Sequence, residues 1–286
     1  MKLFLRLGLV APREAHARLF INDEYAGAYV VVEPIDRTFV TRTFGDAEGD
    51  VEDGGALFEY RWTRSCGFEY LGSALEPYAA LFEPQTRETA SMFSLFRPFE
   101  QLARAIHDST PDAFATAVAP LLDLPAFVRY LAVQNFMADI DGFVGNWGMN
   151  NFLFYRFSDG ARARVIPWDA DQTFTAASLP IDYNADTNAL TRQVMAVPTL
   201  RQIYLDALRE IAAIAAAPVE GDSRGWLERE VDRQTTQIAA AVAADPVLPF
   251  SSEQVQAEIE AMRNFSRERS LVVIRALNTA ASPRAR

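Results

Sequence analysis

The chain has 286 residues, of which 50% are hydrophobic, and it carries a formal net charge of −11 at pH 7. This acidity argues against nucleic acid or an anionic membrane surface as a partner, and no apolar run approaches the roughly 18 residues that a membrane-spanning helix needs. The single cysteine, Cys66, excludes an internal disulfide and a cysteine-based zinc site, and His16 and His107 lie too far apart in sequence to favour a histidine-rich metal site.

Strands are predicted near the N-terminus. The start of the chain, MKLFLRLGLVAP, lacks the small-residue cleavage site of a signal peptide, and its apolar residues suit a core strand. In residues 17–33, two β-rich runs flank Asn22, Asp23 and Gly27, residue types that turns demand, so this segment predicts a β-hairpin. Residues 56–62, ALFEYRW, form a third candidate strand.

From about residue 95 onward the pattern becomes helical. Thr110 and Asp123 are each followed within two residues by proline, which predicts two helix starts. Residues 126–137 are apolar almost all round, a pattern typical of a buried helix. A loop rich in Gly, Asn and Asp follows, and a second hairpin is expected to turn around residues 158–160.

The last third of the chain is also expected to be helical. Apolar residues from Leu200 to Ile214 keep the period of one helix face. Ser251 and Gln254 resemble a capping box that opens the last helix. The length favours one large domain with two lobes over two independent domains.

Two acidic loops bracket the second hairpin: Asp139 and Asp141 precede it, and Asp169 and Asp171 follow it. Because a two-stranded hairpin returns the chain to its starting point, we expect these loops to lie side by side. The entry loop adds neutral oxygen donors from Asn146, Asn150 and Asn151. Carboxylate and amide oxygens without His or Cys suit a hard cation such as Mg²⁺ or Mn²⁺. The alternative for Asp139 and Asp169 is that they cap turns.

The order of these parts is a buried helix, a loop with Asp then Asn, a hairpin, and an Asp-bearing turn. It is the order found in the phosphoryl-transfer site of protein kinases. A second interpretation is a carboxylate-pair hydrolase that uses Asp139 or Asp141 with Asp169, for which a glycosidase would need carboxyl groups about 5–10 Å apart.

The motifs of this region resemble those of the CotH-type kinases, a family named for a bacterial spore-coat protein. The family's "D…GN.G.N" loop corresponds to DGFVGNWGMN at residues 141–150, and its "PWDxD" motif corresponds to PWDAD at residues 167–171. The resemblance runs from about residue 17 to 175, and its further landmarks are FINDEYAGAYVVVEPIDRTFV (20–40), LFEYRW (57–62) and LFEPQT (81–86).

The resemblance implies an α+β, protein-kinase-like two-lobed fold. A small β-rich N-lobe that binds nucleotide is expected over residues 1–90, and a larger, mostly helical C-lobe over 91–286. The C-lobe would carry the catalytic loop at 139–151 and the metal loop at 167–171.

The implied reaction is transfer of the γ-phosphoryl group of ATP to a protein Ser/Thr acceptor, with Mg²⁺ or Mn²⁺. The expected acceptor is a coat or surface protein, because bacterial relatives are often surface-associated or exported. The resemblance places the family's catalytic residue at Asp141. The implied metal ligands are Asp169 and Asn150, with Asn146 as the rival amide and Asp171 as a further metal-binding acid. The implied residues on the nucleotide side are Trp168, Arg61 and Glu33.

One departure concerns the nucleotide lysine, which relatives commonly carry in the strand near 57–62. The only lysine of this chain is Lys2, and Arg61 is the nearest cation in that strand, with Arg64 close behind and Glu33 as an expected ion-pair partner of either. Arginine binds phosphate through its planar fork but is not equivalent to lysine. The alternative function is therefore a catalytically degenerate, kinase-like binding module at the cell surface or spore coat.

Overall fold

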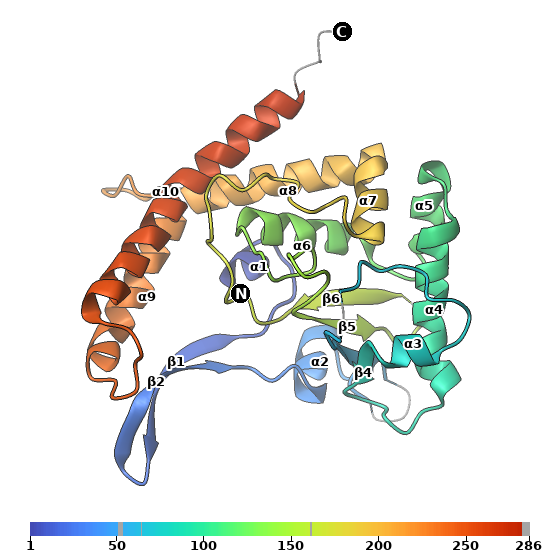
Figure 1. The fold of residues 1–286 in the computed structure, drawn as a ribbon, viewed down its shortest axis with the longest axis horizontal. Coiled ribbons are helices and arrows are strands. Elements are labelled where there is room, and N and C mark those ends of the chain that lie inside the picture. Colours follow the sequence, from blue (N-terminus) through green and yellow to red (C-terminus); the bar gives the residue numbers. More distant parts are fainter. Residues whose placement is uncertain (51–53, 64, 161, 282–286) are drawn as a thin grey trace. The chain divides into compact units, whose positions relative to one another are not determined.

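The structure is a computed structural model that describes residues 1–50, 54–63, 65–160 and 162–281. Helices and antiparallel strands are mixed along the chain, which makes the fold α+β (Figure 1). The elements are α1 (Lys2–Arg6), β1 (Glu14–Ile21), β2 (Glu24–Val32), α2 (Arg37–Phe44), β3 (Ala56–Tyr60), α3 (Glu76–Ala79), β4 (Phe82–Pro84), α4 (Met92–Asp108), α5 (Pro111–Val118), α6 (Leu124–Phe136), β5 (Phe152–Arg156), β6 (Ala163–Pro167), α7 (Ala189–Ala196), α8 (Pro198–Ala216), α9 (Trp226–Ala243) and α10 (Ser252–Ala281).

The chain divides into two compact units. The first comprises Met1–Pro12, Pro34–Thr175 and Leu179–Leu208, and the second comprises Arg13–Glu33, Ala176–Ser178 and Arg209–Arg286. The division into lobes at residues 90 and 91 remains a prediction. Within the described part of the chain, no helix combines the length and the apolar character needed to cross a membrane.

A four-stranded antiparallel sheet forms the centre of the first unit, in the order β4-β3-β5-β6. The predicted hairpin is confirmed as β5 and β6, with Phe152 opposite Pro167. Strand β5 also pairs with β3, where Ala56 lies opposite Arg156 and Glu59 lies opposite Leu153. The sheet therefore joins strands that are about a hundred residues apart in sequence.

Both faces of this sheet are covered, because alternate side chains of a strand point to opposite faces. On one face, Leu57 and Leu153 join a buried cluster with Phe39 and Val40 of α2. On the other face, the ring of Phe58 packs edge-on against Phe99 of α4, with centroids 4.9 Å apart. This double coverage explains why β3 and β5 are apolar along almost their whole length.

Helix α6 confirms the predicted buried helix. It begins after Asp123, whose carboxylate accepts a hydrogen bond from the backbone N–H of Ala126 at 3.2 Å. Ten of its residues are buried, including Gln134 and Asn135, and the loop that carries Asp139 and Asp141 follows directly. The predicted start at Thr110 is also confirmed, as the N-cap of α5.

The second unit contains the other predicted hairpin, β1–β2. Its turn residues Asn22 and Asp23 both have positive φ values, 50° and 67°, which is the backbone of a tight hairpin turn. The Tyr25 hydroxyl donates to the backbone oxygen of Ala241 on α9 at 2.8 Å, so the hairpin packs on that helix. The predicted capping box is confirmed, since Ser251 and Gln254 exchange two hydrogen bonds, of 2.8 and 3.3 Å, at the start of α10.

The interpretation of the N-terminus as a core strand is wrong. Residues Lys2–Arg6 form helix α1, in which Leu3 and Phe4 are buried together with the following Leu7. This spacing of one and four residues places all three on one helix face, whereas a strand would alternate. The ring of Phe4 stacks on Tyr130 of α6 at 5.5 Å, so packing on α6 stabilises the helical conformation.

Candidate functional site

The open end of the β5–β6 hairpin brings the two predicted acidic loops together. Beyond the last strand pair, the backbone N–H of Trp168 donates to the oxygen of Asn151 at 3.1 Å. The N–H of Ile140 donates to the oxygen of Gln172 at 3.2 Å, which ties the entry loop to the segment after PWDAD. The predicted juxtaposition of these loops is therefore confirmed, and its cause is the short local pairing of β5 with β6.

Asp141 is held in a fixed orientation by two asparagines. Its carboxylate accepts hydrogen bonds from the Nδ2 atoms of Asn150 at 3.0 Å and Asn151 at 3.1 Å. The Asp141 side chain is half-buried, and Asn151 has a left-handed backbone with φ of +56°. A non-glycine residue in this conformation costs of order 1 kcal/mol or more, and such residues gather at functional sites.

Asp139 supports this loop from inside. It is 4% exposed and accepts hydrogen bonds from the Asp141 backbone N–H at 3.0 Å and from Gln134 Nε2 at 3.2 Å. Burial raises the pKa of Asp139 to about 6, and the charges of Asp141 and Asp171 raise it further, while hydrogen bonds from the backbone oppose the shift. Gln134 in turn accepts from the Phe143 N–H at 3.1 Å, so Asp139 and Gln134 together fix the start of the loop.

Asp169 lies in the PWDAD turn, with φ of +40°, and its side chain is exposed. Burial raises its pKa above the ordinary value, followed by the charges of Asp171 and Asp141. The three carboxylates therefore repel one another, and their shared negative charge would be relieved by a cation. Among the residues that the structure describes, no group of three or more His, Cys, Asp or Glu side chains could hold a metal ion by itself.

A cleft of roughly 400 Å³ opens beside these residues, between β3 and the end of the β5–β6 hairpin. This volume lies within the range of small-molecule sites. Its lining combines acids, amides, an arginine and aromatic rings: Glu59, Tyr60, Arg61, Trp62, Thr63, Asn150, Asn151, Phe152, Trp168 and Asp169. Trp168 also packs against the buried cluster under the sheet, so it joins the cleft wall to the core.

Other predicted site residues have different partners. Arg61 forms an ion pair with Glu83 of β4, and Glu33 forms one with Arg13 at 2.8 Å in the second unit. Arg64 lies outside the described residues, so its pairing with Glu33 remains a prediction.

The two rival amides differ in their surroundings. Asn146 is exposed and accepts a hydrogen bond from the Tyr183 hydroxyl, whereas Asn150 lines the cleft and contacts Asp141. Asp171 is exposed, and its carboxylate accepts a hydrogen bond from the Gln172 side chain at 3.3 Å.

Several residues that line the cleft were not predicted from the sequence, and two of them are polar contributors. Glu59 of β3 lines it, and Trp62 lines it while its indole N–H donates to the backbone oxygen of Trp147 at 3.0 Å. Glu59 is the one charged residue of the strand ALFEY and is half-buried, so its charge was a usable sign that this position is open to the cleft. Trp62 and Trp147 are 50% and 53% exposed, and the sequence holds no local pattern that pairs them.

Comparisons with known proteins point to one family. A family model described as "CotH kinase protein" matches residues 1–273. The chain is also 23% identical over 277 residues to inner spore coat protein H of Bacillus subtilis (strain 168). The matched region covers 93% of this chain and 70% of that protein.

Proposed function

Because the chain belongs to the CotH kinase protein family, we propose that it transfers the γ-phosphoryl group of ATP to a Ser or Thr hydroxyl of a protein. The proposal includes a kinase-like two-lobed fold, with the nucleotide bound in the cleft beside β3. The observation that carries it is the Asp141 carboxylate, which Asn150 and Asn151 hold next to the Asp169 turn.

In this proposal each residue has a separate role. Asp141 accepts the proton of the acceptor hydroxyl and orients its oxygen, because its two amide hydrogen bonds leave further lone pairs on the carboxylate. Asn150 and Asn151 aim that carboxylate through their two hydrogen bonds. Trp168 supports the turn that carries Asp169.

A divalent metal ion fits the oxygen donors of the cleft and of the PWDAD turn beside it. Asp169, Asn150 and Asp171 offer oxygen atoms only, the kind that Mg²⁺ and Mn²⁺ prefer, and the mutual repulsion of the aspartates favours a bound cation. When bound, the ion would neutralise charge on the nucleotide phosphates. Mg²⁺ is commonly held by one or two carboxylates plus substrate phosphates, which agrees with the small number of acids in the described cleft.

Arg61 is the proposed cationic partner of the phosphates in place of a lysine. It lines the cleft and forms an ion pair with Glu83. The acceptor is proposed to be a coat or surface protein, because the similar protein of Bacillus subtilis is named as an inner spore coat protein.

The test is phosphoryl transfer from γ-labelled ATP with Mn²⁺, to the chain itself and to coat-like Ser/Thr-rich proteins. Asp169→Asn should abolish transfer while leaving the unfolding temperature within about 2 °C of wild type. Asp186→Asn, an exposed Asp elsewhere in the first unit, is the matched control and should transfer normally. Wild-type transfer by Asp169→Asn would refute the assignment.

The second candidate is a binding module without catalysis, and the Arg61–Glu83 ion pair favours it because Glu83 competes with phosphate for the only arginine that lines the described cleft. Thermal shift with ATP and Mn²⁺ separates the two functions. A binding module would be stabilised against unfolding by ATP, and Asp169→Asn would remove that stabilisation. It would nevertheless transfer no label from ATP.

A further inference from the structure

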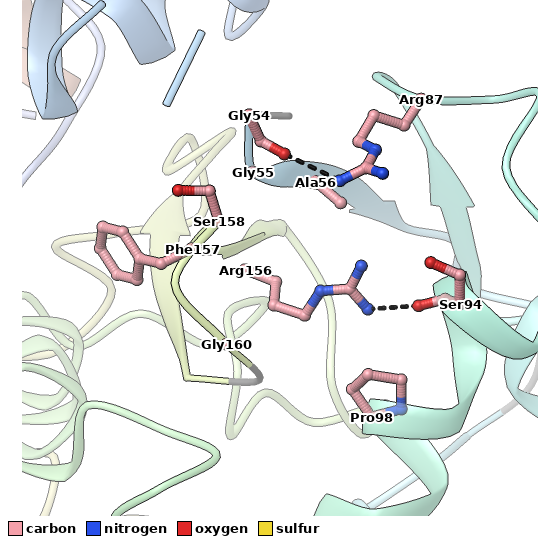
Figure 2. Close-up of a pocket in the computed structure, with 10 residues that line it drawn as sticks. All are labelled: Gly54, Gly55, Ala56, Arg87, Ser94, Pro98, Arg156, Phe157, Ser158 and Gly160. Carbon is pink, nitrogen blue, oxygen red and sulfur yellow. Dashed lines mark hydrogen bonds between the residues drawn. The ribbon is translucent and has the colours of Figure 1, made fainter. Parts of the chain in front are cut away.

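A second pocket, of roughly 240 Å³, lies at the other end of β3 and β5. The pair Ala56–Arg156 marks this end, and the pair Glu59–Leu153 lies toward the cleft. At about 3.3 Å per residue, the two ends are on the order of 10 Å apart. The lining of this second pocket includes two arginines, two serines and a pair of glycines (Figure 2). The residues that line it are Gly54, Gly55, Ala56, Arg87, Ser94, Pro98, Arg156, Phe157, Ser158 and Gly160.

Arg156 is 8% exposed, and its Nη1 donates to the backbone oxygens of Ser94 at 2.8 Å and Leu95 at 3.2 Å. These contacts have a structural reason. Pro98 stands four residues after Ser94 in α4 and has no N–H, so the Ser94 oxygen lacks its usual helical donor. Arg156 supplies that donor through one nitrogen of its guanidinium, which leaves the other two nitrogens for a further ligand.

Arg87 faces the same opening from the segment after β4, and its Nη1 donates to the backbone oxygen of Gly54 at 3.0 Å (Figure 2). Burial lowers the pKa of Arg156, and the nearby charge of Arg87 lowers it further. Two positive charges therefore face one small pocket. No carboxylate of the described residues forms an ion pair with either arginine.

Glu48 contacts Ser158 of the pocket lining, and its carboxylate is occupied by hydrogen bonds from Ser158 and Tyr155. It accepts hydrogen bonds from the Ser158 hydroxyl at 2.7 Å, the Ser158 N–H at 2.9 Å and the Tyr155 hydroxyl at 2.8 Å. These bonds fix the start of the β5–β6 turn beside the pocket, and within the described part of the chain they leave Arg87 and Arg156 without a carboxylate partner.

We propose that this pocket binds the phosphate group of a phosphomonoester, at a site separate from the ATP cleft. Guanidinium forks match phosphate oxygens, and two of them balance a dianion. The volume is below the range of pockets that enclose drug-sized ligands, so it suits a phosphate group and excludes a whole nucleotide. The proposal does not depend on phosphoryl transfer by the chain.

The experiment is calorimetric titration of the full chain with inorganic phosphate, with a phosphoserine peptide and with acetate, at constant ionic strength and without metal or nucleotide. We expect saturable binding of one phosphate per chain, and at least tenfold weaker binding of acetate. A phosphoserine peptide that binds more tightly than phosphate would identify a protein ligand, and equal affinity would identify the free anion. Absence of saturable binding of both would overturn the proposal.

The main variant is Arg87→Gln, which keeps an amide donor for the Gly54 oxygen and removes the charge. It should weaken phosphate binding at least tenfold, the usual size of a charge-assisted hydrogen bond. Arg192→Gln is the matched control, because Arg192 is exposed and likewise donates to a backbone oxygen, that of Asp186 at 3.1 Å. Unchanged affinity in Arg87→Gln, or a loss caused instead by Arg61→Gln in the other cleft, would refute the site.

A variant of Arg156 must be tested together with a second substitution, because Arg156 also donates a hydrogen bond to the backbone of α4. Pro98→Ala restores the helical N–H to the Ser94 oxygen, so Pro98→Ala with Arg156→Gln tests phosphate binding without that structural cost. This double variant should be folded and should bind phosphate at least tenfold more weakly than Pro98→Ala alone. Glu52→Gln with Asp53→Asn removes the carboxyls that precede Gly54 in the sequence. Phosphate binding that appears only in this variant would show that the chain's own acids occupy the arginines, which would also refute the proposal.

Discussion

The two ends of the central sheet carry opposite charge. At one end of β3 and β5, Asp169 lines a cleft that suits a cation, and Asn150 and Asn151 of the same cleft hold Asp141. At the other end, Arg87 and Arg156 line a pocket that suits an anion. Both sites include residues of β3 and β5, so the sheet determines the spacing between them. The net charge of −11 therefore describes the chain as a whole but does not predict which ion a local site binds.

The largest expected effect is at the acidic end. Asp141→Asn should lower phosphoryl transfer by about 10²–10⁴-fold, the range for loss of a positioned general base. The amide keeps the shape of the carboxylate, so ATP binding measured by thermal shift should persist.

Phosphate binding at the basic end is the internal control for Asp141→Asn, and it should be unchanged. Asn146→Ala is the matched loop variant and should retain most activity, because Asn146 contacts Tyr183 and not Asp141. Equal losses with lowered unfolding temperatures would mean that loop stability, and not the carboxylate, explains the result. A loss in Asn146→Ala at an unchanged unfolding temperature would assign the metal amide to Asn146 in place of Asn150.

The next effect is the pH dependence of stability at the acidic end. The pKa of Asp139 is about 6 in the folded chain against an ordinary value of 3.8, so the folded state keeps a proton that the unfolded state has lost. The resulting stability is fully present below about pH 4 and is lost as pH rises through about 6. At about 1.4 kcal/mol per pKa unit, it amounts to at most about 3 kcal/mol.

Urea unfolding between pH 4 and 7, in metal-free buffer, measures this contribution. Asp139→Asn should flatten the curve over that interval, because an amide does not titrate. Asp186→Asn should keep the wild-type slope. A slope that survives in Asp139→Asn would assign the pH dependence to other groups.

A smaller stability effect is expected at the basic end. Arg156→Gln should lower the free energy of unfolding by about 2 kcal/mol, because the Ser94 oxygen loses its donor and the guanidinium no longer packs over the Phe58 ring, 5.8 Å away. Adding Pro98→Ala should recover about half of this loss by restoring the helical hydrogen bond. If the double variant is no more stable than Arg156→Gln, the proline is not the reason for the buried arginine.

Local patterns predicted much of the fold because their causes are local. Turn residues defined the β1–β2 hairpin, and reciprocal hydrogen bonds between Ser251 and Gln254 follow from their spacing. The pairing of β3 with β5 was not predictable in this way, because no short pattern encodes which distant strands pair. The prediction of a strand at the N-terminus was wrong for a similar reason, because the helical conformation of α1 depends on packing against the distant Tyr130.

In the candidate site, too, features with local causes were predictable and features that depend on pairing between distant strands were not. The approach of the Asp141 and Asp169 loops follows from one short hairpin and was therefore predictable. The partner of Arg61 is Glu83, which reaches it only through the pairing of β3 with β4. The basic pocket was not predicted at all, because Arg87 and Arg156 are brought together by the sheet and by a proline in another helix.

The smallest expected effect concerns Arg61, which among the described residues is the arginine that lines the acidic cleft. Glu83→Gln releases Arg61 from its ion pair, and if Arg61 binds the nucleotide phosphates, the KM for ATP should fall by up to about fivefold. The kcat should change little, because the reacting groups are untouched. Glu76→Gln removes an exposed charge elsewhere and is the matched control. The ATP dependence of label transfer measures both variants. An unchanged KM in Glu83→Gln would indicate that Arg61 serves the sheet edge alone. The charge of the phosphates would then be neutralised by the bound cation. Arginine would bind anions at the Arg87–Arg156 pocket and not at the acidic cleft, which is the difference expected between the two ends of the sheet.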